Sequence, residues 1–301
     1  MHFKKEFNFV KMSKTAFIFS IVLTIAGIIS LAAFGLNYSV DFRAGSNVDV
    51  KLSKNVTIAE VQPLLDEMGI GKDASITPGD KRMNIRFTTE LSSNQADQLK
   101  TEIQKLDKTA SFEINTVDPE MAKELGRNAI YSVLLSCIGI IIYVSIRFEW
   151  RFAVAAIIAL LHDAFIVVAI FSIFRLEVSQ TFIVAVLTII GYSINDTIVI
   201  FDRIRENMRF GKQKTREDLT NLLNHSVNQM LMRSLYTAFT VFIAAFFLFL
   251  FAGESIKMFS LAMCIGLVFG AYSSIFIASP LWLFLKFKQK PKGKAVKPSK
   301  A

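Results

Sequence analysis

Two polar side chains, Asn195 and Asp196, stand next to each other inside a long apolar stretch of the sequence. A carboxylate at membrane depth costs about 2.5–3.5 kcal/mol on insertion scales, so such a residue normally faces a protein interior and belongs to an ion or proton path. We therefore interpret Asp196 as a protonatable site that requires a partner elsewhere in the chain.

The partner predicted for Asp196 is Arg233, which stands at the start of the next apolar stretch. Both residues lie near the same end of consecutive predicted helices, and so at comparable depth. A carboxylate that is close to an arginine and shielded from water can load and release a proton as its access to water changes. The same two residues also fit a simpler role, in which the pair holds two helices together.

A second polar pair, His162 and Asp163, lies in the middle of the preceding apolar stretch. It fits either a proton relay or a set of interhelical hydrogen bonds. We therefore take Asp163 and Asn195 as supporting candidates for the proton pathway, behind Asp196 and Arg233. Both cysteines fall within apolar stretches, so the sequence suggests no disulfide framework and no metal site. We also expect no catalytic residue and no cofactor.

The composition is that of an α-helical membrane protein. Hydrophobic residues make up 52% of the 301 residues, and the mean hydropathy is +0.44. Apolar stretches longer than about 18 residues predict transmembrane helices. Six such helices are predicted, at residues 15–36, 129–146, 152–174, 181–201, 235–252 and 258–285. In the last of them, small residues at every fourth position predict a close-packing face: Ala262, Gly266, Gly270, Ser274 and Ala278.

The distribution of Lys and Arg predicts the orientation in the membrane. With the N terminus inside, cytoplasmic segments hold four before the first helix, two at 147–151, seven at 203–233 and seven from residue 286 onward, or 20 in all. The two short outer loops hold one each, so the positive-inside rule is satisfied. The cytoplasmic parts are then 1–14, a charged connection at 202–234, and a basic tail at 286–301 that either contacts anionic lipid or is solvated. The net charge of +9 is thus explained without nucleic-acid binding.

Residues 37–128, between the first two helices, form the one sizeable segment predicted outside the membrane, on the extracytoplasmic side. Alternating apolar residues and capping signals predict the order strand, helix, strand, strand, helix, strand. This is the order of a ferredoxin-like α+β domain. The segment contains no His and no Cys, so we expect a binding or mechanical module rather than a catalytic one.

Five stretches, in the same order along the chain, resemble the signature of the SecF family, the membrane subunits that accompany SecD in bacterial protein secretion. They are VDFRAGS from Val40, LHD from Leu161, GYSINDTIVIFDRIREN from Gly191, RSL from Arg233 and GAYSSIF from Gly270. Among the departures, Ala44 replaces the first glycine of the motif after the first helix, and Ala238 replaces a serine. Ala44 disturbs the turn there if the turn needs a positive φ.

The resemblance implies six transmembrane helices with one ferredoxin-like domain, half of an architecture shared with proton-driven exporters of the RND type. SecD supplies the other half. It also implies that the pair works beside the SecYEG channel and the SecA motor, with YajC as a further partner. On this resemblance, the pair is expected to use the proton gradient to draw preproteins across the bacterial plasma membrane late in export. By position, Asp196 and Arg233 match the family's proton-pathway residues. The resemblance also implies that any ATP hydrolysis belongs to SecA, so we expect the chain itself not to be an enzyme.

Two other functions are compatible with the residues. One is half of an RND-type exporter that acts on a small substrate or a lipid, although such proteins usually carry both halves in one chain. The other is an intramembrane aspartyl protease that uses Asp163 and Asp196 as two carboxylates sharing a proton. The glycine context typical of such proteases is absent, because Gly191 lies five residues before Asp196.

Overall fold

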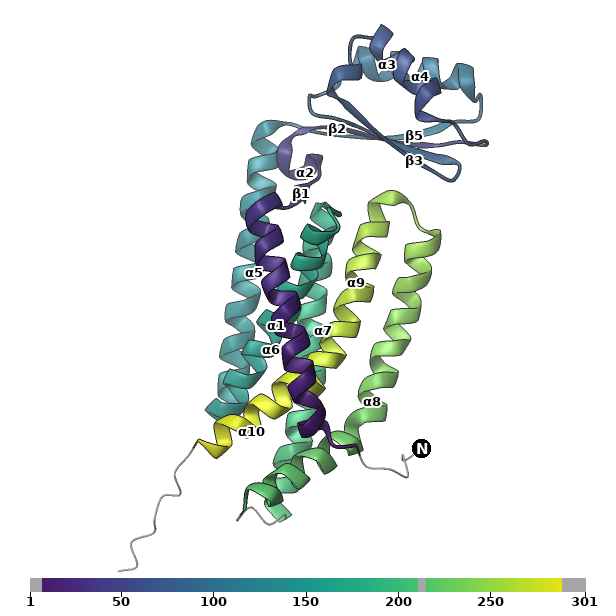
Figure 1. Ribbon diagram of the computed structural model, residues 1–301. Coiled ribbons are helices and arrows are strands. Elements are labelled where there is room, and N and C mark those ends of the chain that lie inside the picture. The colour runs from purple at the N-terminus through teal and green to yellow at the C-terminus, as the bar shows by residue number, and fades with distance from the viewer. Residues whose placement is uncertain (1–6, 211–214, 289–301) are drawn as a thin grey trace, which may run out of the picture.

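The structure is a computed structural model that describes residues 7–210 and 215–288. Figure 1 shows a bundle of long helices with a small α+β domain beyond one end of it. Parts of three predicted cytoplasmic segments lie outside the described residues: 1–6, 211–214 and 289–301, the last of which holds most of the predicted basic tail.

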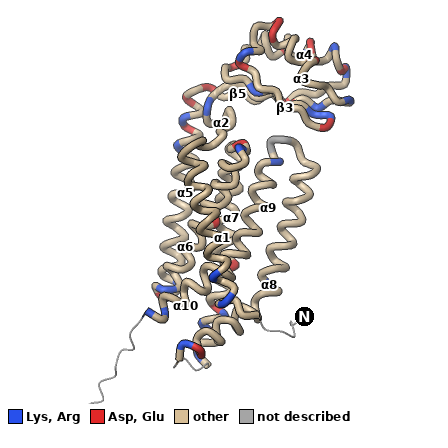
Figure 2. The backbone as a smooth tube through the Cα atoms, in the orientation of Figure 1, with Lys and Arg blue, Asp and Glu red and all other residues tan. Residues whose placement is uncertain are grey.

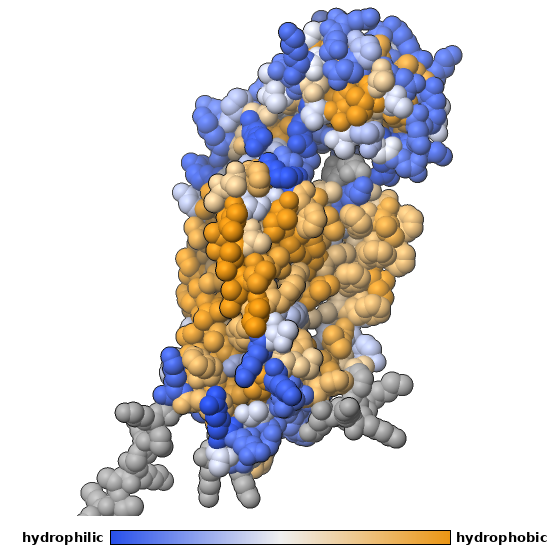
Figure 3. Space-filling view, in the orientation of Figure 1, coloured by the Kyte–Doolittle hydropathy of each residue, from blue (hydrophilic) through white to orange (hydrophobic). Residues whose placement is uncertain are grey.

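Six helices within the described residues are long and apolar enough to cross a membrane, which confirms the predicted fold class. They are α1 (Phe9–Phe34), α5 (Pro119–Arg147), α6 (Trp150–Ile173), α7 (Gln180–Phe210), α8 (Arg216–Phe251), and a composite helix of α9 (Glu254–Ser273), a π-helical turn (Ser274–Ala278) and α10 (Ser279–Phe287). Charged residues gather at the two ends of the bundle and in the α+β domain (Figure 2). The surface between them is an apolar belt (Figure 3).

Several helices run further than their apolar stretches. α5 begins at Pro119, where the Asp118 side chain accepts hydrogen bonds from two backbone N–H groups of the first turn. α7 continues to Phe210, and the capping box of Thr215 with Asp218 starts α8. Most of the predicted connection at 202–234 is therefore a continuation of α7 and α8.

Small residues let α7 and α9 approach each other closely. A Cβ atom added to Gly266 would lie 2.3 Å from the side chain of Ile189, and one added to Gly270 would lie 3.4 Å from the Cβ of Ser193. All five residues of the predicted small-residue stripe are buried. The stripe is thus confirmed as a packing face, and it brings the polar residues of α7 within reach of those on the composite helix.

The α+β domain is a four-stranded antiparallel sheet with two helices on one face. Its elements are β2 (Gly45–Lys51), α3 (Ile58–Glu67), a short 3-10 turn (Gly71–Asp73), β3 (Ala74–Gly79), β4 (Arg82–Phe87), α4 (Ser93–Leu106) and β5 (Ser111–Val117). The strand order is β3-β4-β2-β5, so β2 and β3 run parallel with β4 between them. The βαββαβ order predicted from the sequence is present.

The two faces of this sheet differ in polarity. Alternate residues of β4 are buried in a core with α3 and α4: Met83, Ile85 and Phe87. The residues between them, Arg82, Asn84 and Arg86, point to the opposite face, and Figure 1 shows that this face looks onto the helix bundle. The apolar face therefore holds the domain together, while the polar face is available to contact the bundle.

A short parallel sheet joins the α+β domain to the bundle. β1 (Asn37–Tyr38), after α1, pairs with β6 (Glu177–Val178), between α6 and α7. The one-turn helix α2 (Val40–Arg43) follows, and Asp41 Oδ2 accepts a 2.8 Å hydrogen bond from the backbone N–H of Gln180, the first residue of α7. A carboxylate is favourable at a helix N-terminus. Asp41, in the VDFRAGS motif, thus fixes the start of α7.

The turn that follows α2 does require positive φ angles. Ala44 has φ 66° and ψ 165°, and Gly45 has φ 120°. The conformation of Ala44 belongs to a region that is nearly exclusive to glycine, and it costs of order 1–3 kcal/mol for any other residue. The departure of Ala44 from the family pattern therefore stores backbone strain at the entrance to β2.

Replacing Ala44 by glycine should stabilise the protein. We expect Ala44→Gly to raise the free energy of unfolding by about 1 kcal/mol, the relieved strain less the extra backbone entropy that glycine loses. Thermal unfolding in detergent measures the change. Gly45→Ala should do the opposite, since its Cβ would lie 2.2 Å from the carbonyl oxygen of Phe87. A lower melting temperature for Ala44→Gly would contradict the strain.

The carboxylate of Asp107 ties two loops of the α+β domain together. It accepts hydrogen bonds from the backbone N–H and hydroxyl of Ser53 at 2.5 and 2.8 Å, and from the same groups of Thr109 at 2.9 and 2.7 Å. These four hydrogen bonds hold the pKa of Asp107 well below its usual value, and the bond from the Ser53 backbone N–H has the largest effect. They stabilise the charged form in the folded state.

The stability that Asp107 contributes should depend on pH. Because its pKa is lowered by folding, the contribution is complete above the unfolded pKa of about 3.9 and is lost as the pH falls below it. We expect Asp107→Asn to unfold at a lower temperature than the parent at neutral pH. The difference between the two melting temperatures should become smaller as the pH falls. Melting temperatures measured across the acid range test this, and a difference that is constant with pH would argue against it.

Candidate functional site

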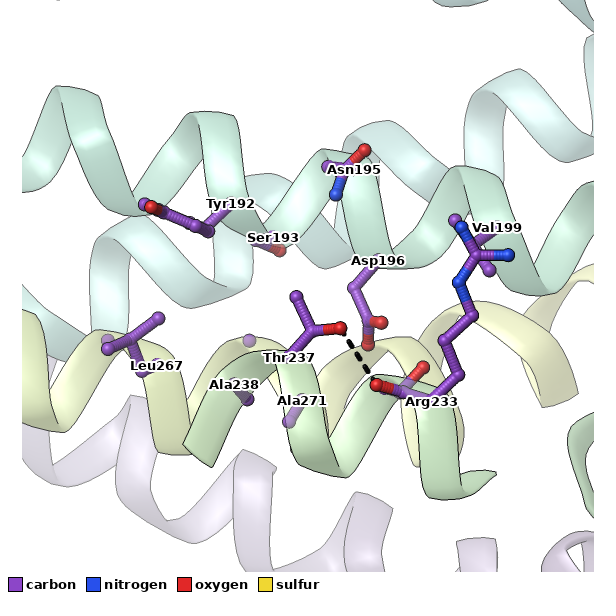
Figure 4. Close-up of a pocket in the computed structure, with 13 residues that line it drawn as sticks. Tyr192, Ser193, Asn195, Asp196, Val199, Arg233, Thr237, Ala238, Leu267 and Ala271 are labelled. Atoms are coloured by element: carbon purple, nitrogen blue, oxygen red, sulfur yellow. Dashed lines mark hydrogen bonds between the residues drawn. The ribbon is translucent and has the colours of Figure 1, made fainter. Parts of the chain in front are cut away.

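Helix α7 carries Asp196 toward α8. In Figure 4 the Asp196 carboxylate points from α7 toward α8, and the Arg233 side chain extends from α8 back toward Val199 of α7. The two candidate residues therefore lie at the same interface between helices.

Asp196 and Arg233 line a cavity of about 110 Å³ between α7, α8 and α9. The other polar residues of its wall are Tyr192, Ser193, Asn195, Ser234 and Thr237. A buried water molecule needs about 10–15 Å³ of accessible volume and two to four polar partners. The cavity thus has room for several water molecules beside the carboxylate, and an acid in such a place can exchange protons with water.

Asp196 is incompletely paired within the part of the chain that the structure describes. Its Oδ2 is buried and has no hydrogen-bond partner there, and neither has the buried Oγ of Ser234. Arg233 acts on the carboxylate through its charge, and the hydroxyls of Ser234 and Ser274 are close to it. The described residues contain no ion pair between Asp196 and Arg233, whose side chain is exposed. A buried oxygen without a partner is costly, so this carboxylate favours a proton or a water molecule as its next ligand.

Asp163 is the fully paired acid of the bundle and is completely buried. Its Oδ2 accepts a 2.5 Å hydrogen bond from Ser193 of α7 and a 2.6 Å bond from Ser273 of α9. Its Oδ1 lies 3.0 Å from Nδ1 of His162. One carboxylate therefore joins α6, α7 and α9, which is the arrangement of a structural hydrogen-bond centre.

The π-helical turn places two consecutive serines toward the two acids. Ser273 donates to Asp163, while Oγ of the next residue, Ser274, lies 2.8 Å from Oγ1 of Thr197, one residue after Asp196. At the end of the turn, the hydroxyl of Ser279, the first residue of α10, donates to the carbonyl oxygen of Ser274 at 2.9 Å. Single π-helical turns inside α-helices are frequent at functional sites. Here the turn connects the surroundings of both carboxylates.

The predicted site residues thus fall into two groups. Asp196, Arg233 and Asn195 line one cavity, although Asn195 points away from Asp196 in Figure 4. Asp163 does not line this cavity. It is connected to the cavity wall through Ser193, whose hydroxyl donates a hydrogen bond to it.

Sequence reasoning missed the hydroxyl groups around the two acids: Ser193, Thr197, Ser234, Ser273 and Ser274. Their signal is weak because Ser and Thr in a helix often bond to their own backbone, as Thr237 does to the carbonyl oxygen of Arg233 at 2.8 Å. Ser273 and Ser274 likewise contact the carbonyl oxygen of Gly270 in their own helix, at 3.1 and 3.0 Å, and it is the close approach of α7 and α9 that also brings their hydroxyls to Asp163 and Thr197.

Comparisons with known proteins agree with this architecture. The family described as "Protein export membrane protein SecD/SecF, C-terminal" matches residues 98–288. The family described as "SecD/SecF GG Motif" matches residues 29–56, which include the turn at Ala44 and Gly45.

Individual relatives match over nearly the whole chain. The protein translocase subunit SecF of Alicyclobacillus acidocaldarius is 45% identical over 286 residues, which cover 93% of each chain. The protein translocase subunit SecDF of Bacillus subtilis is 44% identical over 97% of this chain and 40% of its own length. The crystal structure of SecDF, a translocon-associated membrane protein from Thermus thermophilus, superposes with a TM-score of 0.84 at 34% identity, over 95% of this chain and 39% of that one.

The Asp163 centre should contribute measurably to stability. We expect Ser273→Ala to lower the free energy of unfolding by about 0.6 kcal/mol, the average measured for hydrogen bonds between transmembrane helices, and by no more than about 1.7 kcal/mol. Ser260→Ala is the matched control, because Ser260 is equally buried in α9 and its hydroxyl donates to Ile256 of its own helix. Unfolding of both variants in mixed micelles gives the comparison. Equal losses would show that the bond to Asp163 adds nothing.

Proposed function

The chain belongs to the SecD/SecF family of protein export membrane proteins, and on that basis we propose a proton-coupled role for it in the Sec translocase. It is an auxiliary subunit of that translocase, acts with SecD, and lets protons pass inward through the Asp196 cavity while a preprotein is exported. The observation that carries this proposal is the buried Asp196 Oδ2, which has no hydrogen-bond partner among the described residues and adjoins a cavity large enough for water.

Asp196 is the residue that takes up and releases the proton. Its neighbours define two states of the carboxylate: the charged form is favoured by Arg233, and the protonated form can donate to a nearby hydroxyl such as that of Ser234. A change in the charge of the Asp196 carboxylate alters the electrostatic interactions among α7, α8 and α9, the three helices that line the cavity. Proton passage is thereby linked to helix position.

The two supporting residues have different roles in this scheme. Asp163 is saturated with hydrogen bonds, so it holds α6, α7 and α9 in place while the proton moves nearby. Asn195 is exposed on the outer side of α7. There it is placed to contact a neighbouring helix, such as one from SecD.

The distribution of Lys and Arg supports an orientation with the α+β domain outside the plasma membrane and both termini in the cytoplasm. The wider partners are then the SecYEG channel, the SecA motor and YajC, with the preprotein as the transported chain. ATP hydrolysis belongs to SecA, and this subunit contributes no enzymatic step.

The alternative functions are less well supported. The relatives that match the chain are named translocase subunits, which does not favour an exporter of small molecules. A protease would need two facing carboxylates, but Asp163 is enclosed by Ser193 and Ser273 and Asp196 opens to a separate cavity.

Neutralising Asp196 should abolish the response to a proton gradient. We propose to measure preprotein translocation in proteoliposomes that contain SecYEG, SecA, SecD and this subunit, with and without an imposed gradient. Asp196→Asn should lose the gradient-dependent component and keep the component driven by SecA. If it keeps both in full, Asp196 holds helices together and the proton-coupled role is wrong.

A matched control is Asp202→Asn. Asp202 lies on the same helix two turns later, where it pairs with Arg147 at 3.1 Å and with Arg205 at 2.9 Å. We expect this variant to translocate normally under both conditions, because its carboxylate is already paired outside the cavity.

A further inference from the structure

Strand β4 carries two arginines that reach from the α+β domain to different parts of the helix bundle. Arg82 and Arg86 are four residues apart, so both point to the polar face of the sheet and are about 13 Å apart along the strand. Each contacts a different turn at the outer end of the bundle.

Arg86 contacts the turn between α6 and α7, where it forms an ion pair with Glu177 of β6. The same turn is fixed to the end of α1, because the Arg175 guanidinium donates to the carbonyl oxygen of Phe34 at 2.7 Å. Arg86 therefore attaches the domain to the hairpin of α6 and α7, which carries both buried acids.

Arg82 contacts the turn between α8 and α9. Its Nη1 donates a 2.8 Å hydrogen bond to the backbone carbonyl of Ala252, the residue that ends α8, and α9 begins directly after Gly253. Arg82 therefore attaches the domain to the hairpin that carries Arg233 and Ser273.

The Asp196 cavity lies between these two hairpins, since α7 lines one side and α8 and α9 line the other. A movement of one hairpin against the other changes the spacing between Glu177 and Ala252. The strand that spans them cannot stretch, because β4 is hydrogen-bonded to β2 on one side and β3 on the other. Between the arginines, Asn84 also donates to Asn47 at 2.8 Å and to Asp49 at 2.7 Å. The domain must therefore tilt when the spacing changes.

We propose that β4 transmits the state of the Asp196 cavity to the α+β domain, with Arg86 and Arg82 as its two points of attachment to the bundle. The inference rests on the proposed function, because it requires proton uptake by Asp196 to move α7 against α8 and α9. Neither arginine lines the cavity, so both are positioning residues. Their contribution is to make the outer domain follow the helices.

Glu177→Gln removes the ion pair with Arg86 with the smallest change in the size of the side chain. Burial raises the pKa of Glu177 above its usual value, Arg86 offsets part of this rise, and Asp41 and Asp49 add to it. A raised pKa means that folding disfavours the charged form, so this group costs stability as the pH rises through its folded pKa. Glutamine removes the charge of Glu177 and with it the ion pair, while it keeps the size of the side chain and an amide oxygen that can accept a hydrogen bond from Arg86.

The test uses the translocase in proteoliposomes with three measurements: translocation with a proton gradient, translocation without it, and proton flux reported by a trapped pH dye. We expect Glu177→Gln and Arg82→Ala each to lower the gradient-dependent component about fivefold or more. Translocation without the gradient and the Asp196-dependent proton flux should not change. Lys51→Ala, exposed on the neighbouring strand, should match the parent.

A charge exchange separates transmission from a change in fold. Arg86→Glu alone should lose the gradient-dependent component, and adding Glu177→Arg should restore it. If the attachment variants keep full gradient dependence while Asp196→Asn loses it, the proposed function stands and the role of β4 is wrong. If the attachment variants lose proton flux as well, β4 supports the cavity rather than transmitting its state, and the inference is equally wrong. If Asp196→Asn itself keeps gradient dependence, both proposals are wrong.

Discussion

A carboxylate placed among apolar helices must either be saturated with hydrogen bonds or be able to lose its charge, and the rest of this structure depends on that constraint. Asp163 and Asp196, which lie among the apolar helices that the structure describes, are one of each kind. Asp163 receives two hydroxyl bonds on one oxygen and lies beside His162 on the other. Asp196 has a buried oxygen with no hydrogen-bond partner among the described residues. The first acid is suited to hold helices together, and the second is suited to change state.

The surroundings of Asp163 and Asp196 are connected because α7 and α9 approach each other closely. Gly266 and Gly270 leave no room for a Cβ without a shift of Ile189 or a tight contact with Ser193. This spacing lets Ser273 reach Asp163 across the interface, and lets Ser274 reach Thr197 beside Asp196. A Cβ at Gly266 would lie 2.3 Å from Ile189, so a larger residue there would push α7 and α9 apart and weaken those bonds. The small-residue stripe is therefore part of the site, although it has no chemistry of its own.

Much of the fold could be predicted from the sequence because its signals are local. Long apolar stretches give the helices, and alternation with capping boxes gives the βαββαβ order. The Asp196 cavity was partly predictable, since Arg233 begins the next apolar stretch. The roles of Ser193 and Ser273 were not, because they depend on which way each hydroxyl turns at a contact between distant segments. The function of Asp41, which caps α7 from 139 residues away, is non-local for the same reason.

The uneven packing of the bundle indicates which helix responds to Asp196. In the apolar window of α7, 44% of the residues are buried, against 11% in that of α8. α7 is also held at its outer end by Asp41 and by the pairing of β6 with β1. A helix with few buried contacts moves at lower cost than one that is packed and capped. If Asp196 changes its charge as proposed, we therefore expect α8 to shift more than α7. The outer end of α8 is Ala252, whose carbonyl oxygen is held by Arg82, so the displacement arrives directly at the α+β domain.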